Sequence, residues 1–340
     1  MKNQTLKIAY LFLAMVAVAC TENDEPMYVG ERIAQIVTES DFPAEDGTPT
    51  LQNLMDAGAQ EIISTQEQYE EAIAVQNAID SIYTLTRLQE IVDEVNNKLI
   101  SNDGAFETLK WSDEFNSDGQ PSSDNWNYDI GNGDWGWGNG EEQYYTKSSN
   151  NVTIENGSLK IKAKKEAYGG RSYTSARLKT QGKYSFTYGK LEVRAKLPKG
   201  GGTWPAIWML GNNISTVGWP ACGEIDIMEH KGNDVGYISS AIHNNSGSGA
   251  TPFFHGLNKP DVTDEFHVYG VIWTSKKIQF TVDGNIHYTY NPAVKNDNNW
   301  PFNKRQFIIL NVAMGGTLGG NIDNGFTEGT MEIDYVRLYQ

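Results

Sequence analysis

Short apolar runs with strand-like composition recur along the chain from Phe106 onward, and this pattern restricts the fold more than any other feature. Each run is rich in Val, Ile, Thr, Tyr or Phe and is followed by Gly, Asn or Asp, which favour tight turns. The expected strands are Val152–Ile154, Leu159–Ala163, Gly189–Ala195, Gly223–Met228, Val268–Ile272, Ile278–Val282, Phe307–Val312 and Met331–Tyr339. Because no helical pattern separates them, we predict an all-β domain over residues 106–340, a two-sheet β-sandwich or jelly roll.

The residues before this domain have a different composition. Residues 21–105 contain 18 Asp and Glu against 3 Lys and Arg, whereas residues 106–340 contain 25 against 22. Prolines, glycines and acids predict a linker or leader over residues 20–63. Apolar residues at every third or fourth position from Ser64 to Leu99 predict a helical spacer over residues 64–105. We therefore expect a short helical N-terminal region before the sandwich.

Residues 1–19 have the pattern of a removable signal peptide. Lys2 and Lys7 precede the apolar run Ile8–Ala19, which is shorter than the roughly 20 residues that a membrane-spanning helix needs. Cys20 follows small residues, as in the lipobox of bacterial lipoproteins, so we expect Cys20 to carry the lipid. The alternative is an ordinary secretory signal. The lipid predicts membrane attachment in an outer-membrane lipoprotein, exposed at the cell surface or facing the periplasm.

Several other classes of protein are disfavoured. The formal net charge of −16 gives no electrostatic basis for nucleic-acid binding. The five histidines lack the spacing of zinc ligands, and no phosphate-binding loop or Gly-x-Ser-x-Gly element occurs. Cys222, between Ala221 and Gly223, is expected to be a small buried residue rather than a nucleophile. We expect a monomer that needs no cofactor for catalysis.

The most informative segment is an acidic strand around Glu224, Asp226 and Glu229. Side chains alternate along a strand, so Glu224 and Asp226 share one face. The five-residue offset would turn Glu229 to the opposite face of a regular strand. One extra residue near Met228, a β-bulge, would return it, and bulges favour active centres. We therefore predict a bulge there and three carboxylates on one face.

Three neighbouring carboxylates repel one another, so a function for them is expected. Glycoside hydrolysis uses such groups, because one carboxylate attacks the anomeric carbon and one protonated carboxyl serves the leaving oxygen. A charge between them would raise the pKa of the group that stays protonated. Two alternatives remain at this point: a solvated strand face with incidental acids, and a calcium or magnesium site.

The acidic strand also resembles a known motif. Glu-x-Asp-x-x-Glu within Gly223–Glu229 is similar to the signature of glycoside hydrolase family 16, and its neighbourhood is similar to bacterial laminarinases. The resemblance extends from about Leu109 to Tyr339. It includes the segments Trp111–Phe115, Gly136–Glu141, Tyr173–Arg177, Thr203–Met209 and Ile333–Arg337.

The resemblance implies a jelly roll with a concave glycan cleft and endo-acting, retaining hydrolysis of β-1,3-glucan. It implies that Glu224 is the nucleophile, Glu229 the general acid/base and Asp226 the supporting acid. Family members with the shorter Glu-x-Asp-x-Glu motif lack the bulge, so their specificity is not carried over. Mixed-linkage β-1,3-1,4-glucan is the nearest alternative substrate. A galactan is less expected, since no basic cluster lies near the motif, and a non-catalytic surface glycan-binding protein is the remaining alternative.

Flanking residues are expected to bind the glycan. The candidate stacking platforms for sugar rings are Trp204, Trp208 and Trp219. Each could equally be a core aromatic. By the resemblance, Asn139 and Arg177 bond sugar hydroxyls on the non-reducing side, although Arg177 could be a surface ion-pair residue. The resemblance also places His243 beside the catalytic strand, in contact with Asp226, where the alternative is a structural histidine.

A structural calcium ion is a further expectation from the resemblance. Many family members carry one on the convex side, away from the cleft. Glu114, the Gly157 carbonyl and Asp334 match those positions, and oxygen ligands of this kind suit calcium.

Overall fold

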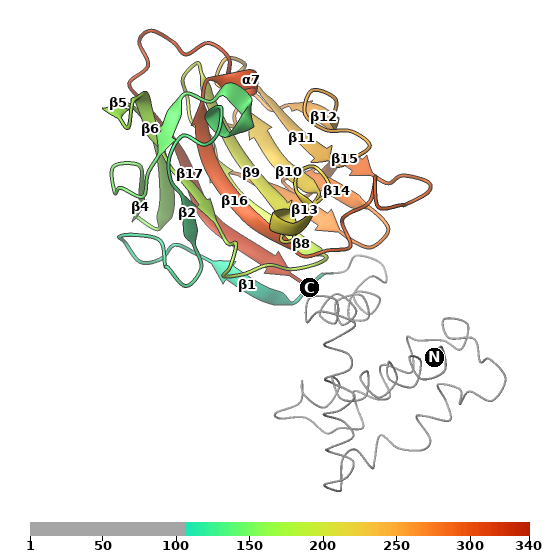
Figure 1. Cartoon of the computed structure of the whole chain (residues 1–340). Helices are drawn as coiled ribbons and strands as arrows, with labels where there is room; N and C mark the ends of the chain where they lie inside the picture. Colours follow the sequence, from blue (N-terminus) through green and yellow to red (C-terminus); the bar gives the residue numbers. More distant parts are fainter. Residues whose placement is uncertain (1–105) are drawn as a thin grey trace, which may run out of the picture. The chain divides into compact units, whose positions relative to one another are not determined.

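A computed structural model describes residues 106–340 of the chain, which form a β-sandwich (Figure 1). The predictions for the signal peptide, Cys20, the linker and the helical spacer concern residues 1–105 and lie outside the described residues. No helix within residues 106–340 is long and apolar enough to cross a membrane.

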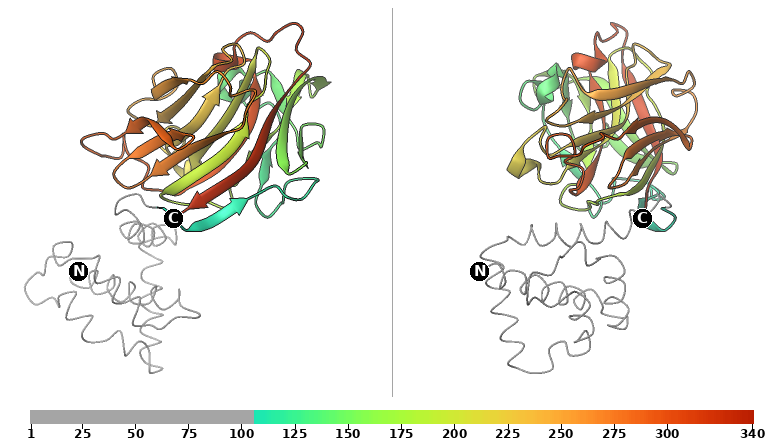
Figure 2. Two further views of the ribbon diagram at one scale, coloured as in Figure 1. Left: turned by 180° about the vertical axis from the view of Figure 1, so that it is seen from behind. Right: turned by 90° about the vertical axis from the view of Figure 1, so that its right-hand side faces the viewer.

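The first sheet has ten strands, nearly all antiparallel, in the order β15-β14-β13-β8-β17-β5-β6-β3, with β1 paired to β17 and β4 to β5. Only β3 and β6 pair in parallel within it. Its strands are β1 (Leu109–Asp113), β3 (Gln143–Tyr145), β4 (Val152–Glu155), β5 (Ser158–Tyr168), β6 (Arg171–Ser175), β8 (Gly189–Lys196), β13 (His267–Trp273), β14 (Ile278–Val282), β15 (Asn285–Tyr290) and β17 (Glu328–Tyr339). Seen from behind, β8 and β17 run side by side (Figure 2).

The second sheet has seven antiparallel strands in the order β12-β11-β10-β9-β16-β7-β2. Its strands are β2 (Asn127–Asp129), β7 (Arg177–Lys179), β9 (Thr203–Gly211), β10 (Glu224–His230), β11 (Tyr237–His243), β12 (Phe253–Asn258) and β16 (Gln306–Met314). Three short helical segments lie in the connections: η1 (Gly136–Gly140), α6 (Ile214–Val217) and α7 (Gly316–Gly319). The two-sheet sandwich predicted from the sequence is confirmed.

Local sequence explains the turns that connect these strands. Asp283 and Gly284 join β14 to β15 with φ angles of 51° and 78°. Asn156 and Gly157 join β4 to β5 with φ angles of 54° and 72°. Positive φ at both central residues is the requirement of the tight hairpin turn that matches strand twist, and Asn-Gly and Asp-Gly meet it at low cost.

One continuous core lies between the sheets. On β8, the buried Leu191, Val193 and Ala195 alternate with charged residues that face outward. From the second sheet, Ile225 and Ile242 enter the same core. The opposite face of the seven-stranded sheet points away from the core and is called the site face below. It carries a smaller apolar cluster, Leu210, Cys222, Phe307 and Ile309, with Trp208 and Ile214 packed against it.

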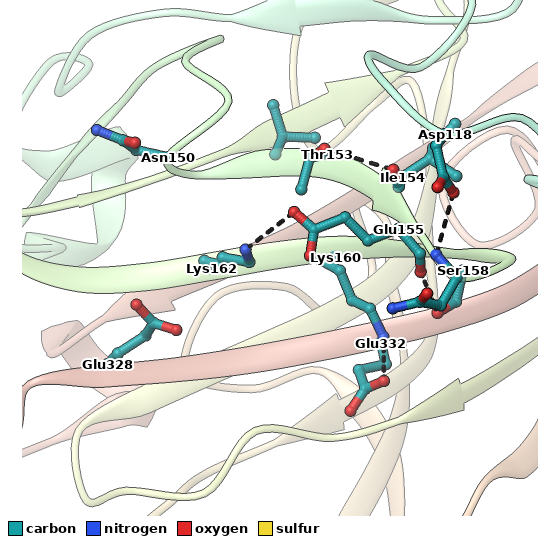
Figure 3. A network of polar contacts seen from close by, with 12 residues as sticks. Asp118, Asn150, Thr153, Ile154, Glu155, Ser158, Lys160, Lys162, Glu328 and Glu332 are labelled. Carbon is teal, nitrogen blue, oxygen red and sulfur yellow. Dashed lines mark hydrogen bonds and ion pairs between the residues drawn. The ribbon is translucent and has the colours of Figure 1, made fainter.

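Ion pairs cover the outer face of the ten-stranded sheet where β4, β5 and β17 meet (Figure 3). Lys162 lies 3.5 Å from Glu155, and Lys160 contacts Glu332. Lys196 on β8 also reaches Glu332, at 2.8 Å. Partly exposed pairs of this kind contribute roughly 0–1 kcal/mol each. Burial of the apolar core therefore supplies most of the stability of the sandwich.

Candidate active site

Strand β10 carries the three carboxylates, and a β-bulge sets their directions. Glu224 pairs with His243 on β11 and Glu229 pairs with Ser239, so five steps along β10 correspond to four along β11. Strand β9 shows a register shift in the same segment of β10. Because side chains alternate along a strand, the extra residue returns Glu229 to the face of Glu224 and Asp226. The predicted bulge is present, and all three carboxylates belong to the site face.

Glu224 is held from two directions. The indole Nε1 of Trp219 donates a 2.9 Å hydrogen bond to its Oε2. The imidazole Nε2 of His243 lies 3.8 Å from its Oε1. Trp219 is 47% exposed, so its ring remains accessible from solvent while its nitrogen contacts the carboxylate. Glu224 therefore combines a fixed direction with access to a ligand.

Asp226 is almost fully buried next to His243, as the family resemblance implied. The backbone N–H of Gly249 donates to Nδ1 of His243 at 3.1 Å, which places the proton of a neutral imidazole on Nε2. That nitrogen lies 3.2 Å from Oδ2 of Asp226. The two groups are not aligned as a hydrogen bond, and Oδ2 has no hydrogen-bond partner among the described residues. The contact is therefore an electrostatic one.

Glu229 has an indole partner of its own. The Nε1 of Trp204 on β9 donates a 3.1 Å hydrogen bond to Oε1 of Glu229. Trp204 and Glu229 are both partly exposed. The two glutamates are therefore each oriented by a different tryptophan. Both indoles lie at the site face and not in the core, and their stacking on sugar rings stays a prediction.

Burial raises the pKa of all three carboxyl groups. For Glu224 and Glu229, loss of hydration is the largest cause and the charge of Asp226 adds to it, and each pKa rises from 4.5 to about 8. Loss of hydration raises the pKa of Asp226 from 3.8 to about 8. The cluster thus retains protons near neutral pH. A carboxyl that stays protonated there can act as a general acid.

A second polar group continues the site face across β9, β16 and β7. Strand pairing leads from Glu229 to Ala206, then to Asn311 and Arg177. The guanidinium of Arg177 lies 4.7 Å from the ring centre of Trp208 and 4.8 Å from that of Trp137. A planar cation close to the faces of two aromatic rings is a favourable arrangement. Arg177 therefore belongs to the site face, and one face of Trp208 is already in contact with it.

Two acidic side chains support this second group. Asp129 on β2 lies 3.0 Å from Nε of Arg177. The buried Glu141 accepts hydrogen bonds from Asn139 at 3.2 Å and from Tyr145 at 3.1 Å. Asn139 is thereby oriented through Glu141, at the end of η1. Both residues predicted to bind sugar hydroxyls, Asn139 and Arg177, are positioned by carboxylates.

Sequence reasoning did not identify these supporting residues. Trp137 and Glu141 lie inside the recognised segment Gly136–Glu141, so the motif itself offered a signal for them. Asp129 and Asn311 lie in ordinary strand sequence. Asn311 accepts a 2.7 Å hydrogen bond from the indole of Trp208. Only strand pairing reveals that these two residues adjoin the site.

Potential metal ligands occur in two places. Glu224, Asp226 and His243 each offer one ligand atom, and these atoms lie within 4.8 Å of one another. They are the only such group of at least three His, Cys, Asp or Glu side chains found within residues 106–340. Two of the three are the carboxylates with raised pKa values. The group is therefore suited either to a cation or to proton transfer.

The residues expected to hold calcium lie around one part of β17. This strand pairs with β5 as far as Ile333 and with β1 from Val336, so the ends of both partners meet near Asp334. Glu114 directly follows β1, and Gly157 directly precedes β5. The pairing thus brings together the three positions that the resemblance implied, two of which carry carboxylates.

Both of these carboxylates have cationic partners. Arg337 donates two hydrogen bonds to Glu114, at 2.9 and 2.7 Å. Arg194 donates to Asp334 at 2.6 Å. The donor set suits calcium, but an ion would compete with two arginines. Calcium binding here stays a prediction.

One further residue is where the sequence predicted. Cys222 is fully buried, and burial raises the pKa of its thiol to about 11, so it behaves as a small apolar residue. His255 is exposed on β12, the edge strand of the seven-stranded sheet, two strands away from β10.

Comparisons with known proteins agree with this geometry. The β-glucanase of Rhodothermus marinus is 41% identical over 244 residues, which cover 68% of this chain and 85% of the relative. The crystal structure of laminarinase from Flavobacterium sp. UMI-01 is 43% identical with a TM-score of 0.65, covering 68% of this chain and 100% of that chain. The laminarinase structure from Rhodothermus marinus is 40% identical with a TM-score of 0.66, covering 68% and 97%.

The family model described as "Glycosyl hydrolases family 16" matches residues 139–337. This range contains the bulged strand with its three carboxylates, both indole donors, Asn139 and Arg177. The match and the similarity to the β-glucanase confirm the family resemblance found in the sequence. The chain belongs to glycoside hydrolase family 16.

Proposed function

We propose that this protein is an endo-acting, retaining β-1,3-glucanase that cleaves β-glucans such as laminarin. One observation carries the proposal: the bulge in β10 places Glu224, Asp226 and Glu229 on one face. Separate indoles orient the two glutamates. Two carboxyl groups with separately controlled directions are what retaining hydrolysis needs. The relatives described as β-glucanase and laminarinases support the choice of substrate.

Each carboxylate has a distinct part in the proposed reaction. Glu224, ionised, attacks the anomeric carbon and forms a covalent glycosyl-enzyme. Glu229, whose pKa is raised, first gives its proton to the leaving oxygen and then deprotonates the attacking water. The negative charge of Asp226 favours the protonated form of Glu229. The Trp219 N–H stabilises the ionised form of Glu224.

The test is hydrolysis of laminarin followed by proton NMR and reducing-end measurement. A retaining endo-enzyme releases the β-anomer first and shortens the polymer quickly. Glu224→Gln should remove activity. Glu229→Ala should lose activity on laminarin, but on a 2,4-dinitrophenyl β-laminaribioside, whose leaving group departs without a proton, azide should raise its turnover by attacking the glycosyl-enzyme without base catalysis. Initial release of the α-anomer would contradict retention. Intact laminarin that nevertheless binds to wild type would favour the glycan-binding alternative.

Linkage preference is part of the same proposal. Parallel assays on laminarin, barley mixed-linkage glucan, agarose and carrageenan separate the three substrate classes. We expect the highest kcat/KM on laminarin. A higher value on barley glucan would reassign the protein to β-1,3-1,4-glucan, and a higher value on either galactan would overturn the glucanase assignment.

Attachment through a lipid at Cys20 is also proposed, on the sequence pattern of residues 1–20. It predicts an outer-membrane lipoprotein whose active domain reaches glycan at the cell surface. Labelled palmitate should enter wild type and not Cys20→Ala, and protease added to intact cells should remove the active domain. Labelling without protease access would favour the periplasmic orientation.

We propose, finally, that Glu114, the Gly157 carbonyl and Asp334 hold one structural calcium. The pairing of β1, β5 and β17 supports this. Such an ion would tie the chain ends to the sheet and would stabilise the fold by mass action. Calcium should raise the melting temperature of wild type above that measured with a chelator, and the increase should be smaller in Asp334→Asn. An equal melting temperature in both conditions would contradict the site.

A further inference from the structure

The carbonyl of Ile227 lies inside the bulge between Asp226 and Glu229, and a side chain of the next strand binds it. Ser240 of β11 donates a 2.7 Å hydrogen bond from Oγ to this carbonyl. Ile227 is 2% exposed and Ser240 is 1% exposed. A bulge interrupts the regular ladder, and a buried carbonyl without a partner costs about 1–3 kcal/mol. The serine hydroxyl therefore stabilises this particular backbone shape.

A histidine of the other sheet fixes the direction of that hydroxyl. Nε2 of His287 lies 3.2 Å from Oγ of Ser240. Because the single hydroxyl hydrogen goes to Ile227, Nε2 must donate to Oγ. Burial, with the neighbouring His255, lowers the pKa of His287 to about 4, so the ring is neutral at neutral pH. Its proton is on Nε2, and the buried Nδ1 has no hydrogen-bond partner among the described residues.

His287 itself occupies an irregular position in its strand. Phe280 of β14 pairs with Tyr288, while the next residue, Thr281, pairs with Ile286, so His287 is an extra residue on β15. β15 belongs to the ten-stranded sheet. The contact between His287 and Ser240 thus connects two bulges, one in each sheet, behind the catalytic strand.

We propose that Ser240, oriented by His287, is a positioning residue for the acid/base Glu229. The inference rests on the function proposed above and extends it to residues outside the site face. The Cα–Cβ direction of Glu229 depends on the backbone angles of the bulge immediately before it. A general acid works only within hydrogen-bond reach of the leaving oxygen, so a small rotation of the bulge weakens proton donation.

The test compares two substrates in the full chain with Ser240→Ala. Laminari-oligosaccharides have a poor leaving group that needs the proton of Glu229. A 2,4-dinitrophenyl β-laminaribioside has a leaving group that departs without one. We expect kcat/KM on the oligosaccharide to fall about 10-fold further than on the aryl glycoside, within the range attributed to general acid catalysis. A role in folding alone lowers both values by the same factor.

A matched control is Ser158→Ala. Ser158 is also a buried serine whose hydroxyl contacts a backbone carbonyl, that of Glu155 at 3.4 Å, but it lies at the β4–β5 turn of the other sheet. This variant should leave the ratio of the two kcat/KM values at the wild-type level. If Ser158→Ala changed this ratio as Ser240→Ala does, the proposal would be overturned. Loss of a serine hydroxyl far from the bulge would then have the same effect as loss of the one bound to it.

A second pair of variants tests the proposal if Ser240→Ala folds poorly. His287→Leu removes the donor to Ser240, and His287→Gln keeps an N–H donor at this position. We expect His287→Leu to lower the ratio of kcat/KM on the oligosaccharide to kcat/KM on the aryl glycoside, as Ser240→Ala does. We expect His287→Gln to keep this ratio near the wild-type value. Equal losses on both substrates in Ser240→Ala and His287→Leu would overturn the positioning role and leave the hydrolase assignment intact. Wild type inactive on both substrates would overturn both proposals.

Discussion

The indole nitrogen of Trp204 lies 3.1 Å from Oε1 of Glu229 and donates a hydrogen bond to it. A donor to a carboxylate favours the ionised form and lowers its pKa. Trp204→Phe removes the donor, so the pKa of Glu229 should rise further. The alkaline limb of the kcat/KM profile on laminari-oligosaccharides should then move to higher pH, by up to about one unit.

Trp219→Phe is the control for this change. Trp219 donates to Glu224 and not to Glu229. Its removal should raise the pKa of the nucleophile, so the acid limb should move to higher pH. If both variants move the same limb, the separate roles of the two indoles are wrong.

Asp226→Asn should move the alkaline limb in the opposite direction. After burial, the charge of Asp226 is the next cause of the raised pKa of Glu229. The asparagine carries no charge, so Glu229 should lose its proton at lower pH, although its burial keeps the pKa above 4.5. The measurement is again kcat/KM against pH, with circular dichroism to verify folding. An unmoved limb would show that burial alone sets this pKa.

Arg177→Lys should weaken glycan binding more than it slows the chemistry. Arg177 contacts the rings of both Trp137 and Trp208 and pairs with Asp129. Lysine keeps the charge but loses the planar, multiply donating guanidinium. We expect KM for laminari-oligosaccharides to rise about 3- to 10-fold, since losing 1 kcal/mol of binding changes affinity about fivefold, with kcat changed far less.

Lys179→Met is the matched control for Arg177→Lys. Lys179 also contacts Asp129, at 2.5 Å, from the same strand. Unlike Arg177, it does not stack on Trp137 or Trp208. A KM increase as large as that of Arg177→Lys would attribute the effect to Asp129 and not to a guanidinium at the site face.

The sequence was sufficient to predict the sandwich and the catalytic strand. Strand periodicity and turn residues are local signals, and all eight expected strands lie on observed ones, apart from Gly223 at the start of β10. The bulge could be predicted because side chains alternate along a strand. An offset of five residues places Glu229 on the opposite face from Glu224, and one extra residue in the strand returns it to the same face. That argument needs no knowledge of neighbouring strands.

The supporting residues could not be predicted in the same way. Asp129 contacts Arg177 because β2 pairs with β7. These two paired residues are 48 positions apart in the chain. Ser240 and His287 meet because two different sheets pack together. Such contacts depend on strand order and on the packing of the two sheets. A single sequence has no local pattern that records either.

Glu224→Gln should stabilise the fold, increasingly so as pH rises. In the folded protein, burial raises the pKa of Glu224 from 4.5 to about 8. The folded state therefore holds this proton more tightly than the unfolded state, and stability falls as pH rises from about 4.5 toward 8. Glutamine has no proton to lose. The melting temperature of the variant should exceed that of wild type slightly at pH 5 and clearly at pH 8, with a gain of about 1 kcal/mol or more.

Glu114→Gln, measured with a chelator present, is the control of opposite sign. The hydrogen bonds from Arg337 hold the pKa of Glu114 below its usual value, so its ionised form stabilises the fold above pH 4.5. Because this pair is about one-third exposed, its loss should cost less than about 1 kcal/mol. Glu114→Gln should therefore melt slightly below wild type at pH 8 and close to it at low pH. If Glu224→Gln also melts below wild type at pH 8, the ionised form of Glu224 does not destabilise the folded protein. The pKa of Glu224 is then not raised by folding, contrary to this prediction.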